Sequence, residues 1–169
     1  MLISESYRRQ NAELHGARPG YGAGHATRRW LPVISRLAQT VKAESILDYG
    51  CGKGWLKGEL GERVCEYDPA IPGKDSAPRP ADLVVSLDVL EHIEPGCLDA
   101  VLDDLKRLTL KCGFFTVAMQ PAVKTLPDGR NAHLIIESPE WWLPRVWARW
   151  RLAEFKDLGG EFLVLVAPR

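Results

Sequence analysis

Three glycines alternate at Gly50, Gly52 and Gly54, and their spacing is the clearest sign of a binding function in the sequence. Glycine has no side chain, so the backbone can come very close to a ligand where it occurs. The residues before the loop predict a buried strand, and those after it predict a short helix. A strand, a glycine-rich turn and a helix start place backbone N–H groups at the sheet edge where ligands bind. We therefore predict a ligand cradle at residues 50–54.

The glycine spacing separates two classes of ligand. A dinucleotide fingerprint has the form G-x-G-x-x-G, and Trp55 occupies its third glycine position here. An indole is a poor neighbour for a pyrophosphate, because the fingerprint needs a helix packed closely on its strand. The pattern present is G-x-G-x-G, with Asp48 two residues ahead of the first glycine. A nicotinamide-dependent oxidoreductase is thus the weaker interpretation. Asp48 either contributes to binding or only stabilises the turn.

A second acid follows the next predicted strand. Asp68 lies 18 residues after Gly50, close to the spacing expected for an acid that binds ribose hydroxyls. Two alternatives stay open. In the first, Asp68 is only a turn residue, because it precedes Pro69. In the second, Glu66 binds the ribose instead of Asp68.

A sheet whose strands alternate with helices must position these residues. Apolar residues at helical spacing predict a helix at 25–42, with Pro32 near its start. Further strands are predicted at 45–50, 63–68, 81–88 and 113–119, and further helices at 53–60, 96–110 and 138–150. Two last strands, 151–158 and 161–167, form a hairpin. This alternation predicts an α/β fold with a mostly parallel sheet and an antiparallel hairpin at its edge. The polar residues 1–24 predict an arm or a lid.

Three motifs, in the same order along the chain, resemble those of the class I S-adenosylmethionine (SAM) methyltransferases. "LDYGCGKG" is similar to their first motif, "CEYDPA" to the end of their second strand, and "SLDVLEHIEP" to the motif beside the methyl donor. The resemblance covers residues 46–169 and implies a Rossmann-like three-layer sandwich that binds SAM. It implies the following cofactor-binding residues: Asp48, Gly50, Cys51, Gly52, Gly54, Asp68, Leu87 and Asp88. The compact architecture also resembles small methyltransferases encoded in phage and prophage genomes.

The chain departs from the family pattern between Asp68 and Asp82. Only 13 residues separate them, where the family usually has a helix, a strand and another helix. A crossover between parallel strands alone needs about a dozen residues. We therefore predict six strands, with one edge strand missing, and expect residues 70–80 to cover the adenine of the cofactor. The acid that often meets the adenine amino group in the family has no clear counterpart here.

A methyl transfer also needs groups that align the acceptor and remove its proton. Such groups are expected at the carboxyl ends of the strands 81–88 and 113–119. His92 follows the first of these strands, and His133 lies in the long loop 120–138 after the second. Loops longer than about 12–15 residues inside compact domains are often functional. We predict His133 and His92 as the catalytic residues.

The same residues resemble a known kind of metal site. An acid-x-x-Glu-His motif with a later histidine is similar to the metal site of the small-RNA terminal 2′-O-methyltransferases and of quinone-precursor O-methyltransferases. That resemblance implies that Asp88, Glu91, His92 and His133 bind a divalent ion, Mg²⁺ or Mn²⁺. Two imidazoles and two carboxylates suit Mn²⁺ better than Ca²⁺. The alternative is that Glu91 and His92 cap a turn and line the pocket, while His133 is a general base or a plain loop histidine.

Composition excludes several other classes of function. The 169 residues carry 22 basic and 22 acidic side chains, so no overall field attracts nucleic acid or an anionic membrane. No apolar run approaches the roughly 20 residues of a membrane span. The four cysteines lack CxxC spacing and predict free thiols in a reducing cytoplasm. The tryptophan-rich helix 138–150 is expected to pack on the sheet through Leu143, Val146, Trp147 and Trp150 rather than to bind nucleic acid.

The sequence thus predicts a single methyltransferase domain, residues 1–169, with an arm and helix at 1–45 and a catalytic core at 46–169. We predict a cytoplasmic, SAM-dependent methyltransferase that acts on an oxygen or nitrogen nucleophile of a small-molecule acceptor. The arm and the loop 120–138 would recognise that acceptor. Two alternatives stay open: a SAM-binding assembly protein without catalysis, and the nicotinamide-dependent oxidoreductase. Charge does not support a nucleic-acid acceptor, and no pattern indicates an oligomeric state.

Overall fold

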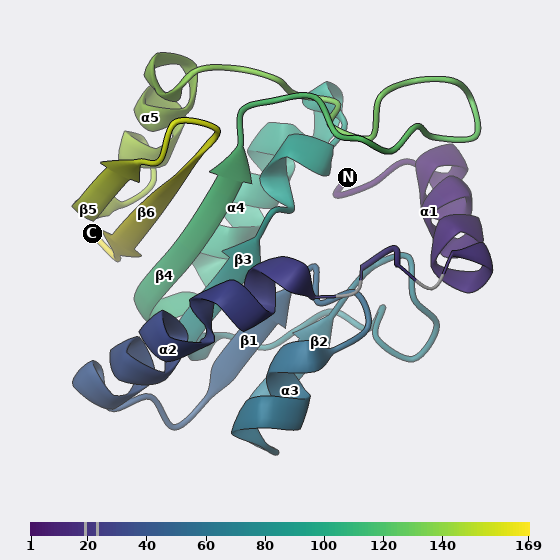
Figure 1. Ribbon diagram of the computed structural model, residues 1–169. Coiled ribbons are helices and arrows are strands. Elements are labelled where there is room, and N and C mark those ends of the chain that lie inside the picture. Colours follow the sequence, from purple (N-terminus) through teal and green to yellow (C-terminus); the bar gives the residue numbers. More distant parts are fainter. Residues whose placement is uncertain (19, 23) are drawn as a thin grey trace.

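The computed structural model describes residues 1–18, 20–22 and 24–169, apart from the side chain of His25, and shows a sheet flanked by helices (Figure 1). Residues 19 and 23 of the predicted arm lie outside the described residues. The strands are β1 (Ile46–Tyr49), β2 (Val64–Tyr67), β3 (Ala81–Leu87), β4 (Thr109–Ala118), β5 (Arg151–Asp157) and β6 (Glu161–Ala167). The α-helices are α1 (Glu5–Ala17), α2 (His25–Thr40), α3 (Trp55–Leu60), α4 (Leu98–Leu108) and α5 (Pro139–Trp147). Two 3₁₀ turns, η1 (Leu90–His92) and η2 (Pro95–Cys97), precede α4.

The six strands form one mixed sheet in the order β2-β1-β3-β4-β6-β5. The first four strands run parallel, and β6 pairs antiparallel with both β4 and β5. The predicted sheet of six strands with a C-terminal antiparallel hairpin is therefore confirmed. Residues 68–80, between β2 and β3, contain no helix or strand, so β2 is the edge of the sheet.

Helices cover both faces of the sheet and enclose two cores (Figure 1). Successive side chains of a strand point to opposite faces, so each central strand feeds both cores. On β3, Leu83 and Val85 pack with Ile34 of α2, whereas Val84 packs with Leu102 of α4. The result is the predicted three-layer sandwich, and it leaves the carboxyl ends of β1, β2, β3 and β4 at one edge.

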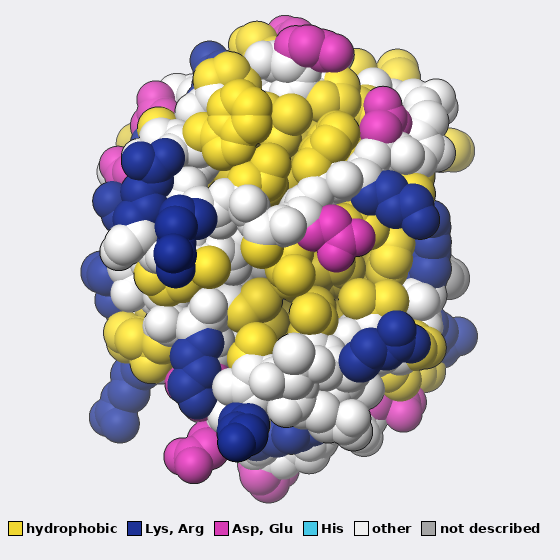
Figure 2. All heavy atoms as spheres, turned by 90° about the vertical axis from the view of Figure 1, so that its left-hand side faces the viewer, with side chains coloured by type: hydrophobic (Ala, Val, Ile, Leu, Met, Phe, Trp, Pro, Cys, Tyr) yellow, Lys and Arg dark blue, Asp and Glu magenta, His cyan; other side chains and the backbone are white. Residues whose placement is uncertain are grey.

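The hairpin strands differ sharply in burial. The inner strand β6 reads EFLVLVA and is mostly buried, as a strand covered on both faces should be. The outer strand β5 reads RLAEFKD and is mostly exposed, and charged side chains are a common way to protect a sheet edge. Figure 2 shows hydrophobic side chains gathered on the side of the molecule that carries α5 and this hairpin, with Lys and Arg around them.

Two details of the predicted helices were wrong. Pro32 lies in the interior of α2, not near its start. The helix begins directly after Gly24, which has a left-handed conformation, so two turns precede the proline. Proline costs this helix one backbone hydrogen bond. The buried side chains of Ile34 and Ala38 still anchor the helix to the sheet.

The apolar face of α5 was also assigned incorrectly at one position. Trp147 is 50% exposed, whereas Trp142 is fully buried in its place. Trp142 and Val146, four residues apart, share the buried side of α5, and Trp150 is buried just after the helix ends. Trp147 lies off that side. Pro144 is accommodated within α5 and does not split it.

Among the described residues, no helix combines the length and the apolar character that crossing a lipid bilayer would need.

Candidate active site

A cavity of about 520 Å³ opens at the carboxyl ends of the parallel strands. Its walls come from the loops after β1, β2, β3 and β4, with α1 and the residues after it as a further wall. The volume lies within the range of pockets that bind small ligands. The predicted residues Gly50, Cys51, Gly52, Asp68, Leu87, Asp88, His92 and His133 all line the cavity. Asp48, Gly54 and Glu91 do not.

The glycine loop has the backbone geometry that the sequence predicted, but its close neighbours are protein atoms. Gly50 and Gly52 have φ values of 78° and 52°. A Cβ at Gly50 would lie 2.5 Å from Cγ2 of Val89, and one at Gly52 would lie 2.8 Å from the carbonyl oxygen of Gly22. The backbone N–H of Lys53 also donates to that carbonyl, at 3.0 Å. The glycines therefore let two other segments close over the loop.

Asp48 and Gly54 support the loop from behind. A Cβ at Gly54 would overlap the carboxylate of Glu66, which forms an ion pair with Lys74 at 3.3 Å. The Asp48 side chain is buried, and its Oδ2 has no hydrogen-bond partner among the described residues. Burial, followed by the nearby charge of Glu66, raises the pKa of Asp48 to about 7. Neither Asp48 nor Gly54 lines the cavity, and of the two it is Gly54 that approaches Glu66 closely.

Asp68 faces the cavity, and its carboxylate can accept further hydrogen bonds. Its Oδ1 accepts from the N–H of Ala70 at 3.0 Å, and its Oδ2 accepts from the N–H of Gly52 at 3.1 Å. These bonds fix the carboxylate, and each oxygen retains a further acceptor site. The alternative acid, Glu66, is engaged with Lys74 and does not line the cavity.

A second group gathers where the loops after β3 and β4 meet. One ligand atom each from Glu91, His92 and His133 lies within 4.8 Å of the others. The two histidine rings stand perpendicular, with centroids 4.7 Å apart. Asp88, predicted as a fourth member, lies apart from this group and accepts a hydrogen bond from the Thr116 hydroxyl at 2.8 Å.

Hydrogen bonds set the tautomers of the two histidines. His92 Nδ1 lies 2.7 Å from the carbonyl oxygen of Ala132, and His133 Nδ1 lies 2.5 Å from that of Gln120. A carbonyl can only accept, so each Nδ1 carries the proton and each Nε2 presents a lone pair. Burial, helped by the nearby His133, lowers the pKa of His92 to about 4. His92 is therefore neutral near pH 7 and can act as an acceptor or a metal ligand.

Glu91 is the buried member of the group. Its Oε1 accepts from the N–H of Ala118, while its Oε2 has no partner among the described residues. Burial raises its pKa well above the usual range. The Glu91 carbonyl accepts from the N–H groups of Leu134 and Ile135. Glu91 thus holds the loop 120–138 against the loop after β3.

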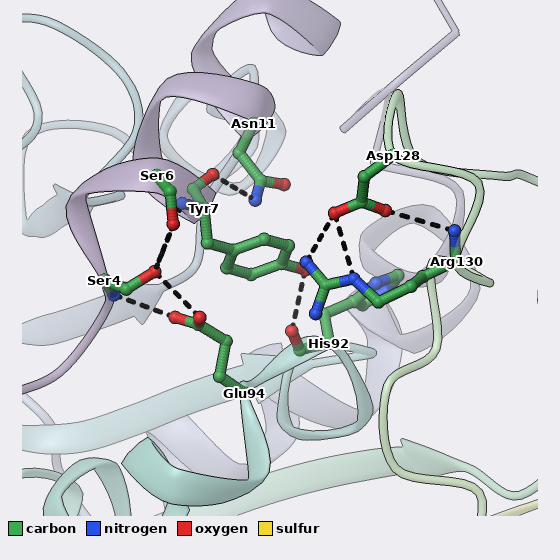
Figure 3. A network of polar contacts seen from close by, with 8 residues as sticks. All are labelled: Ser4, Ser6, Tyr7, Asn11, His92, Glu94, Asp128 and Arg130. Carbon is green, nitrogen blue, oxygen red and sulfur yellow. Dashed lines mark hydrogen bonds and ion pairs between the residues drawn. The ribbon is translucent and has the colours of Figure 1, made fainter.

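Sequence reasoning predicted an arm or lid but missed its cavity residues. Tyr7, Asn11 and His15 of α1 all line the cavity. Their spacing of four residues places them on one face of the helix, and that spacing was the available signal. Figure 3 shows Tyr7 reaching the loop after β3, where its hydroxyl donates to the carbonyl of His92 at 2.8 Å.

Residues 70–80 were expected to cover the adenine, but only Ala70 of this segment lines the cavity. Leu2 and Ile3 line it as well, and Leu2 packs against the core on the α4 side of the sheet. The N-terminal residues therefore close the side of the cavity next to α4.

Known structures with the same fold are numerous, although their sequences are distant. The complex of DhpI with S-adenosylhomocysteine (SAH) has a TM-score of 0.67 and 18% identity, and the match covers 98% of each chain. The N-methyltransferase NodS from Bradyrhizobium japonicum WM9, also with SAH, has a TM-score of 0.68 and 13% identity over 95% of this chain and 98% of that one. No curated protein sequence matches the chain.

A third structural relative contains its acceptor. It is the 1,6-didemethyltoxoflavin-N1-methyltransferase of Burkholderia thailandensis, with a TM-score of 0.64 and 16% identity over 96% of this chain and 88% of that one. The sequence itself matches a family model described as a methyltransferase domain over residues 23–156. That match covers most of the chain, and the protein therefore belongs to the methyltransferase-domain family.

Proposed function

We propose that the protein is a SAM-dependent methyltransferase that acts on an oxygen or nitrogen nucleophile of a small acceptor. One observation carries this proposal: a single cavity joins the glycine loop and Asp68 to the pair His92 and His133. SAH in two of the structural relatives supports the same cofactor.

The residues present fit SAM. The Asp68 carboxylate, held by two backbone N–H groups, has free acceptor sites for the ribose hydroxyls. Leu87 and Asp88 line the cavity beside the glycine loop, where the donor end of the cofactor would lie. Burial raises the pKa of the Cys51 thiol, so Cys51 acts as a small residue in a tight loop rather than as a nucleophile.

SAM supplies a methyl group that is already electrophilic, so the protein must orient the acceptor and take up its proton. His133 is our candidate for the base, because its Nδ1–H is committed to a carbonyl and its Nε2 lone pair is available. His92 stands perpendicular to it and is neutral. An acceptor hydroxyl would donate its proton to the His133 Nε2, whereas an amine could donate to the Nε2 atoms of both imidazoles.

A specific observation also favours metal assistance, as a second candidate for the same site. Glu91 has a buried Oε2 that no described residue contacts by a hydrogen bond, and it lies beside two histidines whose Nδ1 atoms donate to carbonyls. Metal-binding histidines usually show this second hydrogen bond. Mg²⁺ or Mn²⁺ bound by Glu91, His92 and His133 would compensate the buried carboxylate and lower the pKa of an acceptor hydroxyl. In this arrangement Asp88 is a cofactor-binding residue and not a metal ligand.

The acceptor is proposed to be a small molecule. Two structural relatives are named for small-molecule acceptors. They are the 1,6-didemethyltoxoflavin-N1-methyltransferase and the magnesium protoporphyrin IX methyltransferase of Synechocystis. The cavity is closed by α1 and the loop 120–138, and the chain has no net charge to attract a nucleic acid. Phage origin and a cytoplasmic location stay predictions, as does the single domain with an arm and helix at 1–45 and a catalytic core at 46–169.

Binding and turnover can be tested separately. SAH at about 100 times its dissociation constant should stabilise the protein by ~2.7 kcal/mol, which calorimetric melting detects. A shift with NAD but none with SAH or SAM would contradict the proposal and favour the oxidoreductase alternative.

Labelled SAM and a panel of small hydroxyl- and amine-containing acceptors then test catalysis. Methyl transfer that survives a chelator contradicts the metal site and leaves His133 as the candidate base. Transfer that is lost with the chelator and regained with Mn²⁺ supports the metal site. SAH binding without transfer to any acceptor would favour the non-catalytic assembly alternative.

A further inference from the structure

Helix α1 lies outside the matched family region, residues 23–156, yet it forms a wall of the cavity. Its cavity-facing residues are Tyr7, Asn11 and His15, one helical turn apart from each other. Eight residues of helix span about 12 Å. The face therefore reaches from one end of the cavity towards the other.

The start of α1 is fixed to the loop after β3 (Figure 3). Ser4 donates from its backbone N–H and from its hydroxyl to the Glu94 carboxylate, each at 2.8 Å. The Tyr7 hydroxyl donates to the His92 carbonyl. Leu14, further along the helix, packs in a small core with Leu126 of the loop 120–138. These contacts determine where the later residues of α1 lie.

His15 is thereby placed against Asp68. Its Nε2 lies 3.8 Å from Asp68 Oδ2, and its side chain is only 13% exposed. The ring packs edge-on against Tyr21, and a Cβ on Gly22 would lie 2.7 Å from its Cε1. The His15 Nδ1 is buried and has no hydrogen-bond partner among the described residues. The imidazole is thus held tightly, with unused hydrogen-bonding capacity.

The separation of His15 and Asp68 suggests a third group between them. A distance of 3.8 Å is too long for a direct hydrogen bond, but one hydroxyl can contact both side chains. Asp68 can accept from that hydroxyl, while a ring N–H of His15 donates to its oxygen. Burial lowers the pKa of His15, so near neutral pH the ring has one N–H and carries no charge.

We propose that His15 is a cofactor-binding residue, which donates a hydrogen bond to the ribose hydroxyl that Asp68 accepts. The inference rests on the proposed SAM dependence and adds to it a contact from outside the family region. Helix α1 then covers the bound cofactor as well as the acceptor. The side chain of His15 separates the ribose position from the shallow surface pocket on its other side, which Lys53 and Lys74 line.

Calorimetric titration with SAH tests the proposal on four forms of the full chain: wild type, His15→Leu, His15→Gln and Glu13→Gln. His15→Leu should weaken SAH binding about 3- to 10-fold, as expected for one lost hydrogen bond to a buried partner. His15→Gln keeps an N–H near the position of Nε2 and should retain most of the affinity. Glu13 is exposed on the same helix, so Glu13→Gln should bind like wild type. Melting of each unliganded variant checks the fold.

A double-mutant cycle with Asp68→Asn distinguishes a shared ribose contact from a structural role. If both side chains hold one hydroxyl, the loss in His15→Leu/Asp68→Asn is smaller than the product of the two single losses. Equal affinity of wild type, His15→Leu and His15→Gln, or losses that multiply, would overturn the inference and leave the proposed function intact. If wild type itself fails to bind SAH, the proposed function is overturned.

Discussion

The two halves of the cavity are built in different ways. In the cofactor half, the loops after β1 and β2 are joined by backbone hydrogen bonds, such as those from Gly50 and Cys51 to the Tyr67 carbonyl. In the histidine half, backbone hydrogen bonds from Leu134 and Ile135 to the Glu91 carbonyl also join the two loops, but the two histidine rings meet through a side-chain contact. The first half depends on backbone conformations that few residues allow. The second depends on side chains, one of which, Glu91, is buried with an oxygen that has no partner in the described part of the chain. Changes in the first half should therefore damage binding, and changes in the second should alter turnover.

The largest effect is expected at Gly52. Gly52→Val places a branched side chain at a positive φ and against the Gly22 carbonyl. We expect a loss of about 2–4 kcal/mol in unfolding free energy and no measurable SAH binding. Gly58 in α3 is the matched control, because nothing lies within 4 Å of an added Cβ there. Gly58→Ala should stabilise the protein by about 0.5–1 kcal/mol in denaturant titration. If Gly52→Val bound SAH with wild-type affinity, the cofactor half would not depend on the backbone conformation of Gly52.

His133→Ala should give the opposite pattern. We expect turnover to fall by about 10²- to 10⁴-fold, because a positioned base or ligand is lost. SAH affinity should stay within about twofold of wild type, since His133 belongs to the other half. Rates with an identified acceptor and SAH titration measure the two effects. A parallel loss of SAH binding would show that the two halves are not separable.

Asp68→Ala should weaken SAH binding at least about tenfold, because charge-assisted hydrogen bonds to the ribose are worth ~1.5–3 kcal/mol each. Glu66→Ala is the control, since Glu66 bonds with Lys74 outside the cavity. It should change SAH affinity by less than about threefold. If the Glu66 variant loses more affinity than the Asp68 variant, the ribose acid has been misassigned.

The smallest effect is a pH dependence at Asp48. Its pKa is raised from 3.8 to about 7 by burial, so between these values the folded protein holds a proton that the unfolded chain has lost. Stability therefore falls as pH rises through this window. Asp48→Asn removes the titration and should gain on the order of 1 kcal/mol over wild type at pH 8, with little difference near pH 4. Denaturant titrations at both pH values measure this. Glu59→Gln, at an exposed position, retains Asp48 and should follow wild type at both pH values. A parallel pH response of Asp48→Asn and wild type would rule out Asp48 as its source.

The sequence placed Gly50, Gly52 and Asp68 at one cavity because the determinants of their position are local. The spacing of Gly50, Gly52 and Asp68 is set within two neighbouring strand ends, and the six-stranded sheet follows from the alternation of strands and helices. The same reasoning placed His92 and His133 after adjacent strands but not their perpendicular contact, which depends on backbone carbonyls of Ala132 and Gln120.

The parts that the sequence did not predict depend on long-range packing. His15 carries no motif, and its role arises only because Tyr7 and Ser4 fix α1 to the loop after β3. Trp142 and Trp147 lie five residues apart in α5, and the docking of this helix decides which one is buried. Pro32 is tolerated inside α2 because buried contacts beyond it hold the helix.

The place of β6 between β4 and β5 has a consequence for the nascent chain on the ribosome. Residues 113–118 of β4 pair with β6, so those of their N–H and C=O groups that face β6 remain open until residues 161–167 have been synthesised. The hairpin strand β5 is synthesised before β6 and must not pair with β4 in the place of β6. Its charged residues Arg151, Glu154 and Lys156 make it a poor substitute beside the buried Phe114 and Phe115. We expect the half-made sheet to be a binding site for chaperones, and release of that contact to coincide with the insertion of β6.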